Sequence, residues 1–114
     1  MELLLDMKCV ATRRTSLGIT ADEIAVFQPQ VPAWQTVQRA GIVQLERSFA
    51  FKTYRQTLDF VQKVGVLAEA EDHHPTLTVE YGKVTVTWWT HTVKGLHRND
   101  FIAAAKTDQL FAAD

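Results

Sequence analysis

The chain has 114 residues, of which 46% are hydrophobic and 22% are charged, a composition typical of one globular domain. Its formal net charge is −1, so nucleic-acid binding is not expected, and Arg13 with Arg14 makes only a weak basic patch. The single cysteine, Cys9, cannot form an internal disulfide and makes no zinc motif, which suits a reducing compartment. Residues 1–8 lack the features of a signal peptide, and no stretch approaches the roughly 20 apolar residues of a membrane span. We therefore expect a cytoplasmic protein without a membrane partner.

Residues 1–19 show no clean periodicity, so we expect an irregular, partly mobile segment before a single domain over residues 20–114. Thr20 followed by Glu23 matches a capping box and predicts the start of a short helix. The prolines that come after Phe27 end this helix, because proline cannot continue it.

Alternating residues then predict two pairs of strands. The four strands are expected over residues 34–40, 42–51, 76–81 and 83–91. Gly41 and Gly82 permit the turn within each pair, and Arg47 interrupts the apolar face of the second strand. In the last strand, Val84, Val86 and Trp88 share one face, and Thr85, Thr87 and Trp89 share the other.

Two further segments have a helical period. Apolar residues recur every three to four positions from Tyr54 to Ala68, which predicts the longest helix over roughly residues 53–70. A closing helix is expected over residues 97–113. Strands joined by short turns run antiparallel, so the order predicts an α+β fold: a four-stranded antiparallel sheet with helices packed on one face.

The sequence EDHHPTL, residues 71–77, contains two of the four histidines side by side. His91 stands at the end of the last predicted strand, and a helix end and a strand end can meet at the rim of a sheet. Three interpretations of His73, His74 and His91 remain open. They could bind a metal ion, although adjacent residues of an extended segment point to opposite sides. They could be general acid/base groups oriented by nearby carboxylates, or polar loop residues without a function.

A longer pattern resembles the pterin-4a-carbinolamine dehydratases. The matching residues and spacings are Glu69, His73-His74-Pro75, Tyr81, His91 and Asp100. The likeness extends over residues 20–112 and includes Trp34, the R-x-F-x-F strand that begins at Arg47, and Thr90-His91 followed by Gly95-Leu96.

The chain also departs from that family pattern. Asn99 stands where an arginine often precedes the aspartate, and His97 stands where a small hydroxyl residue usually caps the last helix. Trp88 and Trp89 are bulkier than the residues many relatives carry on this strand, and the simplest role for Trp88 is core packing. An acid in the first turn of a helix also favours the helix dipole, so Asp100 is expected to be partly structural.

The resemblance implies an enzyme that removes water from 4a-hydroxytetrahydropterin and gives quinonoid dihydropterin, recycling the pterin of aromatic amino acid hydroxylases without a metal or other cofactor. It implies three catalytic histidines: His73 and His91 are the acid/base pair, and His74 binds and positions the pterin and assists proton transfer. The remaining implied substrate-binding or supporting residues are Glu69 and Asp72, which would orient imidazoles, with Pro75, Thr90, Asp100 and Trp34. For Trp34, covering the pterin ring and packing in the core are equal alternatives, while Tyr81 is expected to be structural.

The resemblance also implies a homodimer or homotetramer, since one layer of helices leaves a sheet face, with Thr85, Thr87 and Trp89, to be covered. Vertebrate members also bind a transcription factor, but nothing in this sequence argues for that role. The alternative function is a non-catalytic assembly factor, for example for Rubisco. Retention of all the histidines favours the enzyme, and neighbouring genes would discriminate between the two.

Overall fold

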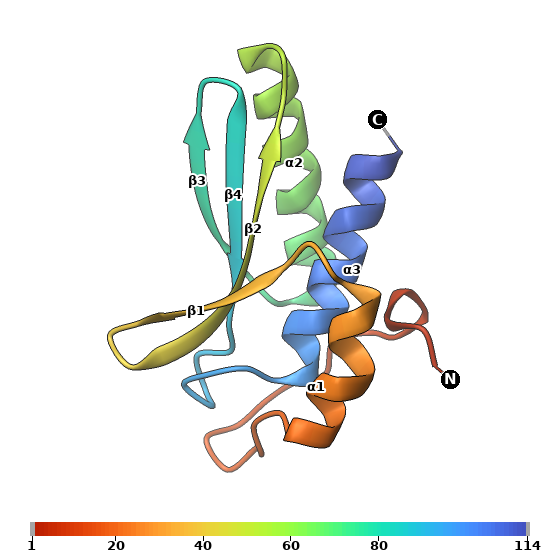
Figure 1. The fold of residues 1–114 in the computed structure, drawn as a ribbon, viewed down its shortest axis with the longest axis vertical. Helices are drawn as coiled ribbons and strands as arrows, with labels where there is room; N and C mark the ends of the chain where they lie inside the picture. Colours follow the sequence, from red (N-terminus) through yellow and green to blue (C-terminus); the bar gives the residue numbers. More distant parts are fainter. Residues whose placement is uncertain (1, 114) are drawn as a thin grey trace.

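The computed structural model describes residues 2–113 and has the predicted α+β order. Its elements are η1 (Leu4–Asp6), α1 (Ala21–Phe27), η2 (Gln28–Gln30), β1 (Gln35–Arg39), β2 (Ile42–Ala50), α2 (Tyr54–Glu71), β3 (Thr76–Glu80), β4 (Lys83–Trp88) and α3 (Arg98–Ala112), where η denotes a short 3-10 helix. Figure 1 shows the four strands with α2 and α3 on the same side of the sheet. The fold class and the helix layer are therefore confirmed.

The sheet is antiparallel throughout, in the order β1-β2-β4-β3. The β1–β2 turn has Ala40 and Gly41 in the left-handed region, with φ values of 53° and 79°, as a tight hairpin with the right-handed strand twist requires. Gly82, with φ of 75°, turns β3 into β4, and a Cβ there would lie 3.0 Å from the carbonyl oxygen of Phe51. These turns set the register within each hairpin, which pairs Val37 with Gln44 and Val79 with Val84.

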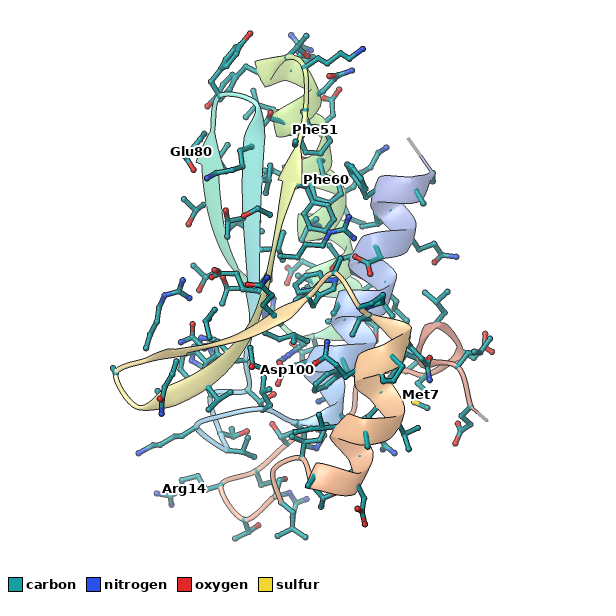
Figure 2. All side chains as sticks on the ribbon, viewed as in Figure 1. Met7, Arg14, Phe51, Phe60, Glu80 and Asp100 are labelled. Carbon is teal, nitrogen blue, oxygen red and sulfur yellow. The ribbon has the colours of Figure 1, made fainter. Side chains whose placement is uncertain are left out.

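The hydrophobic core lies between the sheet and the two long helices, as the predicted alternation in β4 requires. Phe49 of β2 packs against Phe60 of α2, with ring centroids 4.8 Å apart, and Figure 2 shows Phe51 and Phe60 between the sheet and α2. Arg47 also faces this layer, where it pairs with Asp108 of α3 at 2.6 Å and lies over the Phe49 ring. The guanidinium of Arg47, although it is on the apolar face, is thus paired with a carboxylate and packed over an aromatic ring.

The opposite face of the sheet is polar and hydrogen-bonded to itself. The Ser48 and Thr85 hydroxyls lie 2.9 Å apart, and the Thr87 hydroxyl donates to Glu46 at 2.7 Å. Arg39 forms an ion pair with the same glutamate at 2.8 Å. These pairs satisfy the polar groups within one copy of the chain, so this face is not an exposed apolar surface.

Residues 2–19 are largely irregular, and they pack against the rest of the fold. Their one regular element is η1, and Leu4 is completely buried there. At the other end of the segment, the Ile19 N–H donates to the Leu96 carbonyl at 2.8 Å. No helix within residues 2–113 combines the length and the apolar character needed to cross a membrane.

Candidate active site

The end of α2 fixes the direction of the adjacent histidines. Asp72 adopts the left-handed conformation, with φ of 50°, directly after the helix. The His73 N–H donates to the Ala68 carbonyl at 3.1 Å and the Asp72 N–H to the Glu69 carbonyl at 3.3 Å, the two bonds of a Schellman motif. The sharp turn that follows leaves the His73 side chain 11% exposed and that of His74 58% exposed.

His73 is held on two sides. Its Nε2 lies 2.6 Å from Oδ1 of Asp100, and its ring stacks on Trp88, with centroids 5.3 Å apart and an interplanar angle of 19°. Trp88 is fully buried, so this contact rests on the rigid core of the sheet. The imidazole therefore has one orientation before any substrate arrives.

Asp100 is the buried carboxylate that organises this region, and Figure 2 shows it at the start of α3. Its side chain is 0% exposed, and its second oxygen accepts the Thr90 hydroxyl at 2.8 Å and the His97 N–H at 2.9 Å. A carboxylate only accepts hydrogen bonds, so Nε2 of His73 carries a hydrogen and Nδ1 is left to exchange a proton. Asp100 thus has the structural role expected in the first turn of α3 and also orients His73.

His74 and Glu69 form a second histidine–carboxylate pair, with Nε2 and Oε2 2.6 Å apart. Both side chains are largely in solvent, so the interaction is screened and weak compared with the buried pair. Glu69 therefore contacts His74, the outer of the two adjacent histidines. Asp72, the other expected orienting carboxylate, has its structural role in the turn.

His91 lies beyond the sheet. The predicted strand over residues 83–91 was too long, because β4 ends at Trp88 and the chain turns back through a bridge between Thr90 and Gly95. The exposed His91 ring stacks on Trp89, with centroids 3.8 Å apart and an interplanar angle of 20°. The bulky tryptophan pair therefore supports two imidazoles, one inside the molecule and one at its surface.

The three histidines meet at one open hollow of about 320 Å³, which we call the histidine hollow. It is lined by Thr12, Asp72, His73, His74, Thr90, His91 and Thr92. The volume is at the lower end of the range for small-molecule sites. A hollow of about 750 Å³ near Phe51 and Phe111 is larger, but it has no imidazole, so we assign the site by its chemistry.

Other residues that the sequence singled out lie away from the histidine hollow. Trp34 is 2% exposed in the core, where it packs edge-on to Phe49 and donates from Nε1 to Asp108 at 2.8 Å. The structure therefore gives the core alternative for Trp34, away from the histidine hollow. Tyr81 is 77% exposed at the β3–β4 turn, and Pro75 links the histidine pair to β3 without lining the hollow. Sequence reasoning missed Thr12, because nothing in its irregular segment indicated a contact with distant loops.

His97 caps α3 in place of a hydroxyl residue. Its Nδ1 accepts the Asn99 N–H at 3.0 Å, and Asp100 completes a capping box. Burial lowers the pKa of His97 below its ordinary value, which favours the neutral ring needed to accept this bond. Within residues 2–113, no group of three or more His, Cys, Asp or Glu side chains is arranged to hold a metal ion.

The fold and the site together define a small α+β protein with a carboxylate-held histidine at one end of its sheet. The profile of the family "Pterin 4 alpha carbinolamine dehydratase" matches residues 18–110. A protein of Nitrosococcus oceani named "Putative pterin-4-alpha-carbinolamine dehydratase" is 50% identical over 110 residues, covering 96% of this chain and 97% of that protein. The chain belongs to the pterin-4-alpha-carbinolamine dehydratase family.

Two solved structures share the fold. The crystal structure of a transcriptional coactivator/pterin dehydratase from Brucella melitensis is 30% identical, with a TM-score of 0.74 over 82% of this chain and 98% of that one. A pterin dehydratase-like protein identified as a RuBisCO assembly factor in the alpha-carboxysome is 25% identical, with a TM-score of 0.59 over 68% and 88% of the two chains.

Proposed function

We propose that this protein dehydrates 4a-hydroxytetrahydropterin to quinonoid dihydropterin by general acid/base catalysis in the histidine hollow. The observation that carries the proposal is the buried His73–Asp100 pair at 2.6 Å, which opens onto the same hollow as His91. Family membership supplies the substrate class. The product would return to use as the cofactor of aromatic amino acid hydroxylases.

The reaction breaks the bond between the tertiary carbon and its hydroxyl oxygen. One histidine donates a proton to that oxygen, which leaves as water, and the other accepts the proton of the adjacent ring nitrogen as the carbon–nitrogen double bond forms. Imidazole side chains can both donate and accept a proton, and each transfer contributes on the order of 10²–10⁴-fold. Asp100 stabilises positive charge on His73 during its step, as a buried partner carboxylate does.

His73 and His91 have different surroundings that suit a pair of opposite roles. His73 is almost buried and its Nε2 is committed to a carboxylate, whereas His91 is exposed and is held by stacking on Trp89. His74, paired with Glu69 at the outer edge of the hollow, would position the pterin. The proposal therefore assigns proton transfer to His73 and His91 and binding chiefly to His74.

The test is the absorbance decay of freshly generated 4a-hydroxytetrahydropterin with the wild type and with His73→Ala, His74→Ala and His91→Ala. We expect His73→Ala and His91→Ala to lose about 10²-fold or more in kcat, and His74→Ala to act mainly on KM. His97→Asn is the matched control, since it removes an imidazole outside the hollow and keeps a good N-cap. Full activity in His73→Ala would refute the assignment.

A role as a non-catalytic assembly factor is the second candidate, and the likeness to the RuBisCO assembly factor favours it. That likeness is lower in identity, coverage and TM-score than the likeness to the Brucella dehydratase structure. A folded wild type that dehydrates the substrate no faster than buffer would make this the leading function. Rubisco assembly in the presence and absence of the protein would then be the next assay.

A further inference from the structure

A short piece of the N-terminal segment runs across the end of the molecule that carries the histidines. We call residues 9–12 the N-terminal strap; they precede residues 18–110, which match the family profile. Figure 1 shows this part of the chain beside the loop between β4 and α3. The Cys9 N–H donates to Oε1 of Glu71 at 2.8 Å, so the strap is tied to the last residue of α2.

Asn99 holds the middle of the strap by both of its amide atoms. Its Oδ1 accepts the Val10 N–H at 3.0 Å, and its Nδ2 donates to the Val10 carbonyl at 2.7 Å. Asn99 is 3% exposed, so water competes little for these bonds. Only a side chain with both a donor and an acceptor can make this pair of contacts, which an arginine at the same position could not.

Glu71 is a charged anchor beneath the strap. Its side chain is 6% exposed and pairs with Nζ of Lys106 at 2.7 Å. Burial opposes ionisation, but the hydrogen bonds from Lys106 and from the Cys9 backbone outweigh it, so the pKa of Glu71 lies below its ordinary value. The strap therefore rests on a fixed carboxylate at one point and on a buried amide at the next.

The strap ends inside the histidine hollow. Oγ1 of Thr12 lies 2.5 Å from Oγ1 of Thr92, the residue after His91, and both threonines line the hollow. These two hydroxyls hydrogen-bond to each other. Each can also donate a hydrogen bond to, or accept one from, the polar atoms at the edge of a heterocyclic substrate. Through Thr12, part of the lining of the hollow thus comes from a segment outside the matched family region.

We propose that Thr12 is a substrate-binding residue that contributes to specificity, and that Asn99 is the positioning residue that holds the strap as a wall of the site. This inference rests on the proposed dehydratase function. When the substrate binds, hydrogen bonds to it would replace the bond between the two hydroxyls, which strengthens binding without changing the proton transfers at His73 and His91. The strap therefore acts on KM, and it discriminates among pterins that differ at the edge facing Thr12.

The kinetic test compares Thr12→Val, Asn99→Ala and the matched control Thr15→Val, an exposed threonine in the next turn. We expect KM to rise about 3- to 10-fold in Thr12→Val and about 10-fold or more in Asn99→Ala, with kcat within about twofold of the wild type. We expect Thr15→Val to have the kcat and the KM of the wild type. An unchanged KM in Thr12→Val overturns the binding role, and this rim variant remains informative if Asn99→Ala does not fold.

Cys9 supplies a readout that does not need activity. Burial raises the pKa of its thiol to about 12, and Sγ lies 3.5 Å from the Asn99 carbonyl oxygen, so a thiol reagent reacts when the strap opens. Asn99→Ala should speed labelling at least about 10-fold, while Thr15→Val should not. If Asn99→Ala is labelled faster but keeps the wild-type KM, the proposal that the strap forms a wall of the substrate site is refuted. An inactive wild type refutes the dehydratase proposal instead, and labelling still tests whether Asn99 anchors the strap.

Discussion

Replacement of Asp100 by asparagine changes one atom of a completely buried side chain and should disable His73 without removing it. The His97 N–H can only donate, so the asparagine oxygen must take the place of the carboxylate oxygen that accepts it. The amide nitrogen then faces Nε2 of His73, 2.6 Å away in the wild type. Nε2 must become the acceptor, the hydrogen moves to Nδ1, and Nδ1 loses the lone pair with which it could accept a proton.

The size of the effect follows from these contacts. A general acid/base group in the wrong tautomer forfeits about 10²–10⁴-fold in kcat. The loss of a charge-assisted hydrogen bond to a buried carboxylate also lowers the free energy of unfolding by about 2 kcal/mol. For a domain of this size, that corresponds to a fall in Tm of roughly 10 °C. Asp100→Asn should therefore remain folded at 25 °C but be nearly inactive.

The assay is single-turnover dehydration by Asp100→Asn at 25 °C, with circular dichroism to establish that the variant is folded. Asp108→Asn is the matched control on the same helix, because Asp108 binds Trp34 and Arg47 in the core instead of a histidine. We expect a similar loss of stability in the control with kcat retained. A folded Asp100→Asn with wild-type kcat would refute the argument that this carboxylate sets the His73 tautomer.

Three further predictions concern stability. Gly82→Ala should lower Tm by roughly 10 °C in thermal unfolding, since φ is +75° and the new Cβ would lie 3.0 Å from the Phe51 carbonyl; an unchanged Tm would contradict this. Asp72→Gly should raise the free energy of unfolding by about 0.5 kcal/mol in urea, because glycine adopts the left-handed conformation without strain. Burial lowers the pKa of His97 from 6.5, so the unfolded chain binds more protons and stability falls as pH drops through 6.5. His97→Asn should lose less stability than the wild type between pH 7.5 and 5.5, and an equal loss would remove His97 as a cause.

Local periodicity was sufficient to predict most of the fold. The capping box at Thr20 and the helical repeat of α2 each gave an element close to its observed bounds, and the alternation in β4 gave the start of that strand, because local propensity and burial agree there. The strand predicted over residues 83–91 was too long, because β4 ends at Trp88. Lys94-Gly95-Leu96 indicated a turn, and Lys94 has φ of 53°, but the strand-like residues 89–91 did not show that the strand ends at Trp88 and that Thr90 already bridges to Gly95.

The sequence was sufficient to group the three histidines, but not to predict the contacts that they make. The spacing of His73, His74 and His91 indicated one site, and all three line one hollow. The dual role of Asp100 depends on a pairing across 27 positions, and the place of Thr12 depends on contacts 80 positions away. Such pairings follow from tertiary packing, which the local pattern of a single sequence does not reveal.

The most direct test of the central claim is the initial rate at which the purified wild type dehydrates 4a-hydroxytetrahydropterin, compared with the spontaneous rate in the same buffer. If the histidine hollow is an acid/base site for this substrate, the protein should accelerate the decay, and His73→Ala should lose about 10²-fold or more of that acceleration. A folded wild type that leaves the decay at the buffer rate would contradict the proposed enzyme.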